Sequence, residues 1–599
     1  MQSRPEIVGT FGVVTYTHWL ATAAGMAVLE KGGNAFDAAV VTGCVLHIVE
    51  PDQNGPGGEV PIILWSVAKE QIDVICGQGV APASLSVDHL RDLGHAMMPG
   101  IGHLPAVVPG SFGAWMLLLR DYGSWTVREV LEPAIEIARN GFVLKPEIAE
   151  MIASCGDFMS KHWPSSAEVF LPGGETPQAG TLMRIPAQGE TYARLIREAE
   201  SVGSKREAQI EAARAAWYEG FVAEAIDHFM REPVMDTSGE ASAGLLCGQD
   251  LADWRAEVEA PITYDYGEYT VCKAGPWSQG PVMLQQLALL KGFDLDSMDP
   301  SGPEFVHTVQ ECAKLAFADR EAYYGDPKMA EVPLMHLLSD DYNAARRRLV
   351  GNDASMELIP GVIEGFGGSL QLLPEGSASA AHSEMAVGSD PESSAAESWA
   401  QYLAEHHGDT CHLDIIDRWG NMISATPSGG WLNGSPVVPG LGFCVSVRGQ
   451  MFSLDKDHPN VLAPRKRPRT TLTPSLALQN GEPYLAFGTP GGDQQDQWAL
   501  HAFLRHVHHG VNLQQACDAP GFYTNHVPSS FYPREWTPGH LAVEAGFSRE
   551  TMAALHQRGH RLEVYPRWGQ YNSVTMASRQ EGILRAAASP RRACYAIGR

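Results

Sequence analysis

Thr410 opens a stretch of sequence that could carry nucleophilic chemistry. The strings TCHLDIID and MISATPSGG flank the short RWGN and are typical of strand, turn and strand. A threonine hydroxyl is a poor nucleophile unless a base removes its proton, and an α-amino group on the same residue is a compact base with a pKa near neutrality. That amine exists only after scission of the bond between Asp409 and Thr410. The sequence therefore predicts a precursor that cuts itself before Thr410.

Side chains alternate along a strand, which sorts the residues after Thr410 onto two faces. His412 and Asp414 share the face of Thr410, whereas Cys411 points the other way and is expected to be core. Because the amine already supplies a base, we interpret His412 as a structural residue. A weaker alternative makes Cys411 the nucleophile.

The turn of this hairpin decides which residue lies opposite Thr410. A turn centred on Trp419 sets Ser428 across from it, and a two-residue turn moves the partner to Gly429 with Ser428 still near. Ser428 is therefore a second candidate hydroxyl.

Acyl transfer also needs donors aimed at the developing oxyanion, and AFGTPGGDQQDQW offers a place for them. It reads as a strand, then Gly491 and Gly492, then a helix from Gln494. Two glycines let backbone N–H groups approach a carbonyl oxygen closely. An ordinary strand-to-helix turn is the favoured interpretation of this segment taken alone.

The elements around these residues follow from composition. Helical spacing of apolar residues appears from Trp19 to Gly33, from Asn34 to Glu50, and through much of residues 111–231, so helices are expected to concentrate before residue 365. Residues 365–409 are rich in Ser, Ala, Gly and Glu and are typical of a flexible connector. We expect a helix-rich portion, 1–364, a connector, 365–409, and a portion beginning with the hairpin, 410–599.

The bulk composition narrows the partners. The chain has 599 residues, 44% hydrophobic and 19% charged, enough for a large core and two or more lobes. A formal charge of −27 works against nucleic acid and anionic membranes and favours a small-molecule substrate. Neither a signal peptide nor a membrane span is evident, so a cytoplasmic location is expected.

No cofactor or metal is expected. The ten cysteines show no C-x-x-C pair, which is typical of buried, reduced thiols. A histidine cluster near the end of the helix that follows Gln494 lacks both H-E-x-x-H and an acidic ligand at helical spacing, so a solvated helix end is the favoured interpretation. Its members are His501, His506, His508 and His509.

The motifs resemble those of the γ-glutamyltransferase family, also called glutathione hydrolases, over nearly the whole chain. The strings GGNAFDAAV, EPDQNGPGG, VPGSFGAW, FADREAYYGDP, KRPRTTLTPSLAL and GTPGG follow in the family's order and approximate spacing. The resemblance implies the α+β, four-layer αββα sandwich of N-terminal-nucleophile hydrolases, with large and small subunits cut from one precursor. A dimer of such units is left open.

The resemblance also implies roles for single residues. Thr410 falls on the nucleophile, Ser428 on a hydroxyl residue bonded to it, and Gly491 and Gly492 on the oxyanion-hole glycines. The positions implied to bind substrate are Thr470, Thr471 and Gln450.

Three family anchors differ in this chain. Gln78 stands in place of the arginine for the substrate α-carboxylate, Gly430 in place of an asparagine, and Ser453 in place of the aspartate for the α-amino group. A bidentate arginine–carboxylate pair is a strong recognition element, so ordinary γ-glutamyl binding is weakened. Either Arg467 or Arg469 compensates by facing an anionic group, or both belong to a solvated loop.

These observations predict a self-processed amide hydrolase or acyltransferase that forms a Thr410 acyl-enzyme. Its substrates are γ-glutamyl or related small carboxylated amides of the glutathione type. Two alternatives remain open: an amidohydrolase for a glutaryl or oxamate-like acyl group, and an unprocessed relative that acts as a binding protein.

Overall fold

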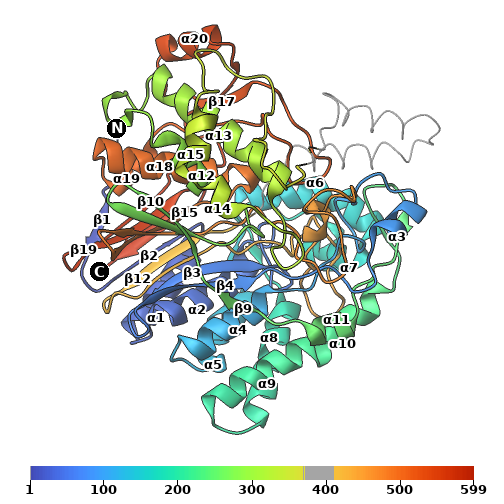
Figure 1. Ribbon diagram of the computed structural model, residues 1–599. Helices are drawn as coiled ribbons and strands as arrows, with labels where there is room; N and C mark the ends of the chain where they lie inside the picture. Colours follow the sequence, from blue (N-terminus) through green and yellow to red (C-terminus); the bar gives the residue numbers. More distant parts are fainter. Residues whose placement is uncertain (1, 369, 371–409) are drawn as a thin grey trace.

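Two seven-stranded sheets, stacked face to face between helices, form the centre of the computed structural model (Figure 1). The structure describes residues 2–368, 370 and 410–599. Nearly all of the predicted connector, together with Asp409, lies outside the described residues. Every strand pairing within the two large sheets is antiparallel.

The first sheet combines strands from both ends and the middle of the chain. Its order is β1 (Ile7–Gly9), β20 (Ile583–Ala588), β19 (Thr575–Gln580), β15 (Glu482–Gly488), β14 (Ser475–Gln479), β11 (Tyr269–Lys273) and β10 (Ile262–Tyr266).

The second sheet carries the hairpin that begins near Thr410. Its order is β21 (Tyr595–Gly598), β2 (Gly12–Tyr16), β12 (Leu413–Asp417), β13 (Met422–Ala425), β3 (Val60–Ser66), β4 (Gln71–Gly77) and β9 (Glu257–Glu259). Strands from the predicted large and small portions therefore alternate within one sheet, so neither portion completes the core alone.

Small apolar side chains fill the space between the two sheets. Ile416 and Met422 of the second sheet share a buried cluster with Leu476, Ala486 and Ala577 of the first. Small residues on facing strands let the sheets approach closely, as in other stacked sheets. This interface fixes the position of β12 relative to β15.

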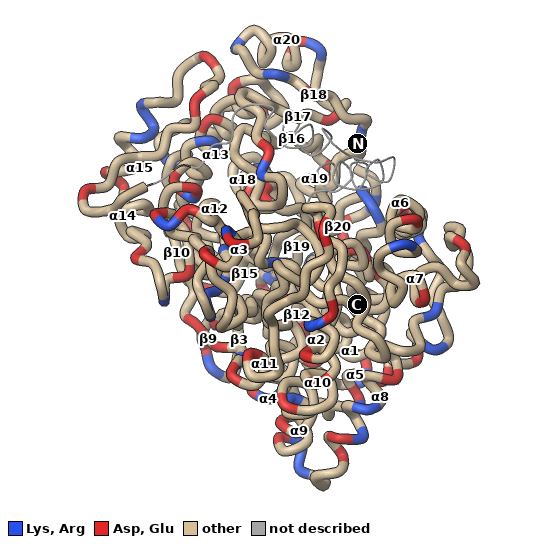
Figure 2. The backbone as a smooth tube through the Cα atoms, turned by 90° about the vertical axis from the view of Figure 1, so that its right-hand side faces the viewer, with Lys and Arg blue, Asp and Glu red and all other residues tan. Residues whose placement is uncertain are grey.

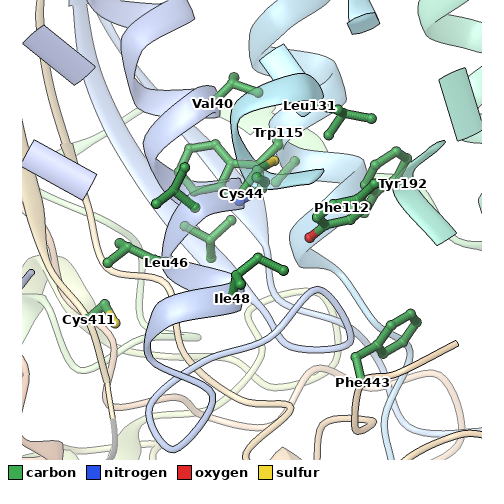
Figure 3. Packing of buried hydrophobic residues seen from close by; sticks show 14 of the residues in the cluster. Val40, Cys44, Leu46, Ile48, Phe112, Trp115, Leu131, Tyr192, Cys411 and Phe443 are labelled. Atoms are coloured by element: carbon green, nitrogen blue, oxygen red, sulfur yellow. The ribbon is translucent and has the colours of Figure 1, made fainter. Parts of the chain in front are cut away.

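One helical layer covers the outer face of the second sheet. Leu413 and Ile415 of β12 pack there against a large apolar cluster, and Figure 3 shows Val40, Cys44, Leu46 and others of this cluster around one helix. The helices of this layer are α1 (Trp19–Glu30), α2 (Ala35–Val49), α4 (Ser111–Asp121), α5 (Val127–Asn140), α6 (Pro146–His162), α8 (Pro186–Ser201) and α9 (Arg206–Tyr218).

The second helical layer covers the outer face of the first sheet. Leu485 and Phe487 of β15 pack there among residues of α12 (Pro281–Leu290), α13 (Pro303–Tyr323), α18 (Gln495–His509) and α19 (Leu513–Asp518). The four layers confirm the predicted αββα sandwich. Most helices precede residue 365, but α18, α19 and α20 (Arg549–Gln557) follow it.

The helix that begins after Asn34 was predicted from the sequence. The Asn34 side chain caps α2 by accepting hydrogen bonds from the backbone N–H groups of Phe36 and Asp37. The Asp37 carboxylate in turn accepts from the Asn34 backbone N–H. This capping box satisfies donors that the first turn of a helix leaves open. The apolar α2 lies directly beneath β12, and the chain turns back at Glu50.

Shorter elements complete the molecule. Among them, β17 (His540–Glu544) and β18 (Arg561–Tyr565) pair in parallel beside β16 (Phe522–Tyr523). The remaining helices and strands are α3 (Val87–Asp92), α7 (Pro164–Phe170), α10 (Phe221–Met230), α11 (Gly248–Asp253), α14 (Leu334–Leu337), α15 (Asp340–Arg347), β5 (Phe142–Val143), β6 (Leu182–Met183), β7 (Val234–Met235) and β8 (Ala241–Ser242).

Charged residues of both signs mix on the outer helices, as Figure 2 shows around α5, α8 and α9. Arg128 of α5 pairs with Glu200 of α8 at 2.7 Å, and Arg139 pairs with Glu190 at 3.1 Å. Such exposed pairs contribute about 0–1 kcal/mol each. Within the described residues, no helix has the length and apolar character needed to cross a bilayer.

Candidate active site

Two hydroxyls meet at the start of the hairpin. Thr410 and Ser428 form an antiparallel bridge, and their side-chain oxygens lie 3.1 Å apart with both residues buried. The ladder pairs Leu413 with Ala425, which is the register of a turn centred on Trp419. The structure thus has the first of the two predicted registers, with Ser428 rather than Gly429 opposite Thr410.

A buried arginine contacts the second hydroxyl. Arg448 donates from Nη2 to Ser428 Oγ at 2.7 Å and from Nε to Glu59 Oε1 at 2.5 Å. The other Glu59 oxygen accepts from Ser446 Oγ, and the Glu59 backbone exchanges two hydrogen bonds with Ser428. The Arg448 guanidinium also lies 4.8 Å from the Trp431 ring centroid.

Neither Arg448 nor Glu59 was singled out from the sequence. The available signals were a carboxylate directly after the glycine-rich loop DQNGPGG and an arginine inside an otherwise uncharged stretch. A charged residue in an apolar setting is usually paired when it is buried. Their partnership joins positions 389 residues apart, so local pattern could not reveal it.

The backbone of Thr410 is held as well. With its side-chain amide turned to satisfy both neighbours, Gln53 donates to the Thr410 carbonyl oxygen at 2.6 Å and accepts from Arg592 at 3.1 Å. Gln53 lies in the glycine-rich loop DQNGPGG, so this loop contacts Thr410 directly.

Cys411 occupies the opposite face of the strand, as predicted. Its Sγ donates to Glu50 Oε2 at 3.0 Å and accepts from Asn54 Nδ2 at 3.2 Å, inside the helical-side core (Figure 3). Burial, followed by the nearby Glu50 carboxylate, raises the pKa of the Cys411 thiol well above its ordinary value. A buried, protonated thiol facing away from Ser428 does not favour the alternative in which Cys411 is the nucleophile.

His412 belongs to a network between the sheets. Its Nδ1 lies 2.9 Å from Thr426 Oγ1 and its Nε2 lies 3.1 Å from Asp414 Oδ1. Asp414 in turn accepts from Thr575 Oγ1 of the first sheet at 2.6 Å. The imidazole therefore links β12 to its neighbours, in keeping with the structural role expected for it.

The glycine pair follows the end of β15. A Cβ at Gly488 would lie 2.3 Å from the His412 ring, so β15 ends against the nucleophile strand. Gly491 has φ = 120° and a Cβ there would lie 2.3 Å from the Trp498 ring, while Gly492 has φ = 58°. Both glycines adopt conformations that side chains disfavour.

Gln279 joins the glycine pair to the hydroxyl pair at residues 470 and 471. Its backbone N–H donates to the Thr470 carbonyl at 2.9 Å, and its side-chain amide donates to the Gly492 carbonyl at 3.4 Å. Arg320 donates to the Gln279 side-chain oxygen at 2.7 Å. The Thr471 hydroxyl is buried and makes no hydrogen bond to a described residue.

The other predicted substrate positions lie in two places. Gln450 shares the 3₁₀ turn η3 (Arg448–Met451) with Arg448, and its side-chain oxygen accepts from the Tyr532 N–H at 3.1 Å. The Ser453 hydroxyl accepts from the Asp455 N–H at 3.0 Å. Because Arg448 and Gln450 share this turn, the bond from Arg448 to Ser428 connects the turn to the hydroxyl pair.

Gln78 lies at the end of β4 and lines a cavity of about 430 Å³. Its amide donates to the Gly79 carbonyl at 3.1 Å, while its buried oxygen lacks a partner among the described residues. Gly430, where the family has an asparagine, adopts φ = 64°. Asparagine tolerates this left-handed region better than most residues, so the exchange preserves the turn.

The expectation of a solvated loop at Arg467 and Arg469 was wrong, since both side chains are buried and held by carboxylates. Arg467 binds Asp326 at 2.7 Å and Glu259 at 2.6 Å. Arg469 donates to Glu321 at 2.7 Å, and burial lowers its pKa to about 10. A guanidinium already committed to internal carboxylates has little left for an anionic substrate.

The histidines near the end of α18 are not gathered around one point. His501 is buried and stacks on Phe522 with ring centroids 3.8 Å apart, whereas His506 and His508 bond Tyr484 and Tyr266 at 2.6 and 2.7 Å. The expectation of a solvated helix end was therefore only partly right, because His501 lies in the core.

Elsewhere among the described residues, three side chains lie close enough together to hold a metal ion: His307, Glu311 and His560. His307 and His560 bond each other at 2.9 Å, and Glu311 is paired with Lys314 at 2.6 Å. The atoms of these three residues that face one another are therefore already engaged in hydrogen bonds or an ion pair.

A paired hydroxyl and a guanidinium thus meet just before β12, and β15, which leads into the glycine turn, ends against His412. Attack by Thr410 Oγ1 on a carbonyl needs a proton acceptor, an aligned nucleophile and donors for the oxyanion. The Thr410 hydroxyl is the candidate nucleophile, and the backbone N–H groups of Gly491 and Gly492 are the candidate donors. This arrangement is suited to acyl transfer.

Comparison with known proteins agrees with this geometry. A family model described as gamma-glutamyltranspeptidase matches residues 21–598. The glutathione hydrolase-like YwrD proenzyme of Bacillus subtilis (strain 168) is 29% identical over 99% of each chain. Other relatives of similar identity are named acylase and oxamate amidohydrolase proenzymes.

Solved structures give the same result. The structure of LmbA2991HD is 48% identical, with a TM-score of 0.91 over 100% of both chains. The cephalosporin acylase from Bacillus halodurans is 28% identical, with a TM-score of 0.81 over 100% of this chain and 98% of that one. The protein studied here belongs to the γ-glutamyltranspeptidase family and is an enzyme of the N-terminal-nucleophile hydrolase class.

Proposed function

We propose that the chain cuts itself before Thr410 and then hydrolyses small amides through a Thr410 acyl-enzyme. The observation that carries this proposal is the 3.1 Å contact between the Thr410 and Ser428 hydroxyls at the start of β12. The products of the cut would be a large subunit, 1–409, and a small subunit, 410–599. Relatives named as proenzymes support a precursor.

In the first reaction, Thr410 Oγ1 attacks the carbonyl carbon of Asp409, the C–N bond breaks, and the hydroxyl proton passes to the leaving Thr410 nitrogen. The acyl group moves to the hydroxyl, and water then hydrolyses the ester. Thr410 is left with a free amine, which takes the hydroxyl proton in later turnovers. The substrate amide is attacked in the same way, its nitrogen leaves as an amine, and water releases the acid.

We further propose that the substrate is a γ-glutamyl or related amide with a small carboxylated acyl group. Gln78 carries no charge, and Arg467 and Arg469 are engaged by Glu259, Asp326 and Glu321. This favours a modified acyl group, such as glutaryl or an oxamate-like one, as the alternative to γ-glutamyl. The diversity of names among the relatives supports keeping both.

A denaturing gel and a substrate panel test the proposal. Wild type is expected to give two fragments, and Thr410→Ala one full-length band without hydrolysis. The panel holds γ-glutamyl and glutaryl anilides and oxamate, with release of the amine or ammonia as the readout. Turnover of γ-glutamyl amides alone would reject the modified acyl group, and a single inactive wild-type band would reject the proposal.

A further inference from the structure

We infer that Arg448, held by Glu59, is a positioning residue that makes the Ser428 hydroxyl a hydrogen-bond donor to Thr410 Oγ1. The inference rests on the proposed function, because it assigns a direction to the contact between the two hydroxyls. It adds a charged pair to a site in which only hydroxyls and glycines had been expected.

The direction follows from what each group can donate. A guanidinium has N–H donors and no acceptor, so Ser428 Oγ must accept the 2.7 Å bond from Arg448. That bond commits one lone pair of Ser428 and leaves its single proton. A cation on the oxygen also makes the hydroxyl a better donor and a poorer acceptor. The 3.1 Å contact therefore runs from Ser428 to Thr410 once negative charge develops on Thr410.

The arginine is fixed firmly enough to impose this direction. Its side chain is fully buried, and Nε binds Glu59. Glu59 N–H donates to the Ser428 carbonyl at 2.8 Å, and the Ser428 N–H donates to the Glu59 carbonyl at 3.0 Å. Ser446 Oγ occupies the second Glu59 oxygen. Residue 428, its cation and the counter-ion thus form one rigid unit.

The consequence for the reaction is a stabilised Thr410 oxygen. The Thr410 proton passes to its own amine as an Oγ1 lone pair bonds to the carbonyl carbon, and the C=O electrons move onto the oxygen beside the glycines. When the C–N bond breaks, the leaving nitrogen takes the proton from the ammonium. Ser428 keeps its proton throughout and donates most strongly when Oγ1 carries most charge, including when Oγ1 leaves during deacylation.

The same charges act on the Thr410 amine with opposite signs. The Arg448 cation disfavours an ammonium nearby, whereas the Glu59 carboxylate favours one. Removing Arg448 should therefore move the acidic limb of the pH–rate profile to higher pH, and neutralising Glu59 should move it to lower pH. Other charged groups on elements around Thr410 stay unchanged in both variants; they are Glu50, Asp52, Lys145, Asp414 and Arg592.

The test compares Arg448→Met, Arg448→Lys and Glu59→Gln with Arg139→Met, which removes an exposed pair on α5. Each protein is assayed for precursor cleavage and for pH-dependent hydrolysis of the amide that wild type turns over fastest. Arg448→Met should lower kcat by at most about 10²–10³-fold, the cost of losing a whole donor, because it weakens the Ser428 donor without removing it; added guanidinium ion should give partial rescue. Arg448→Lys should lie between, and Arg139→Met should match wild type.

Three results would overturn the inference. The first is a kcat of Arg448→Met equal to that of Arg139→Met, and the second is a loss of kcat accompanied by neither rescue nor a shift of the acidic limb. The third is an acidic limb of Glu59→Gln that does not move to lower pH. If Arg448→Met does not fold by circular dichroism, Arg448→Lys and Glu59→Gln carry the same test. An uncut, inactive wild type would instead reject the proposed function. A cut, active wild type with control-like variants would reject the inference alone.

Discussion

The reactivity expected of Thr410 depends on which neighbouring side chains lie on its face of the hairpin. Thr410 and Ser428 share one face of the hairpin, and Cys411, the adjacent residue, points into the opposite layer. A thiol is normally the stronger nucleophile, since a few per cent of it is ionised near neutral pH. Burial of Cys411 beside Glu50 raises its pKa and removes that advantage.

Replacing Cys411 with alanine should therefore leave catalysis intact. We expect Cys411→Ala to be cut and to hydrolyse amides with kcat within about threefold of wild type, because only two hydrogen bonds of about 1 kcal/mol each are lost. Iodoacetamide should not inhibit wild type at neutral pH. Inhibition with the label mapped to Cys411 by mass spectrometry would contradict this assignment.

The turn between β15 and α18 is constrained in two ways at Gly491. Gly491 combines a positive φ with close approach to the Trp498 ring. Gly481, in the turn between β14 and β15, has a positive φ of 84° but open space around its Cα. Substitutions at the two glycines therefore distinguish the effect of backbone strain from the effect of a steric clash.

Gly491→Ala should lose activity as well as stability. A non-glycine residue at such a φ costs about 1–3 kcal/mol, and the clash with Trp498 must also shift the turn. We expect a lower melting temperature and kcat reduced by about 10²-fold, as for a displaced oxyanion donor. Gly481→Ala should show the strain alone and keep wild-type kcat. Equal kcat in both variants would argue against a catalytic turn at Gly491.

Local elements were predictable because their signals are local. Period-two alternation sorted the hairpin residues onto two faces, and a turn centred on Trp419 was one of two candidates, the one that pairs Thr410 with Ser428. Asn34 marked the start of α2. The pairing of Arg448 with Glu59 was not predictable, since it depends on two distant loops meeting. For the same reason, the sequence could not show that distant carboxylates pair with Arg467 and Arg469, and it left a solvated loop as one of two alternatives.

At the scale of the whole molecule, a buried ion pair joins the helical layer to the segment that precedes β12. Lys145, which precedes α6, binds Glu50 at the end of α2, and Glu50 also accepts from the Cys411 thiol. Burial alone would raise the pKa of Glu50, but Lys145, with a smaller contribution from His18, brings it down to about 2. A buried carboxylate kept ionised in this way links stability to pH.

Removing the lysine should destabilise the fold in a pH-dependent manner. Lys145→Met leaves an uncompensated buried charge, which costs about 3–5 kcal/mol at neutral pH. A depressed pKa adds stability above the unfolded value of 4.5, and this stability is lost as pH falls toward about 2. The difference from wild type in urea unfolding should therefore shrink over that range. Lys456→Met, which breaks an exposed pair with Asp88, should cost at most about 1 kcal/mol.

The interleaving of strands from both portions lets the molecule stay assembled after a cut in the chain. In the second sheet β12 and β13 lie between β2 and β3, so the two fragments share one core. Cleavage therefore need not separate the subunits. It would free the Thr410 amine within an already folded site.

The intact mass of the purified, active enzyme tests this account most directly. Denaturing mass spectrometry should find two polypeptides, residues 1–409 and 410–599, with the smaller one beginning Thr-Cys-His and bearing the acyl group when turnover is trapped. Full amide hydrolysis by a single uncut chain of 599 residues would contradict the account, because Thr410 would then have no amine to accept its proton.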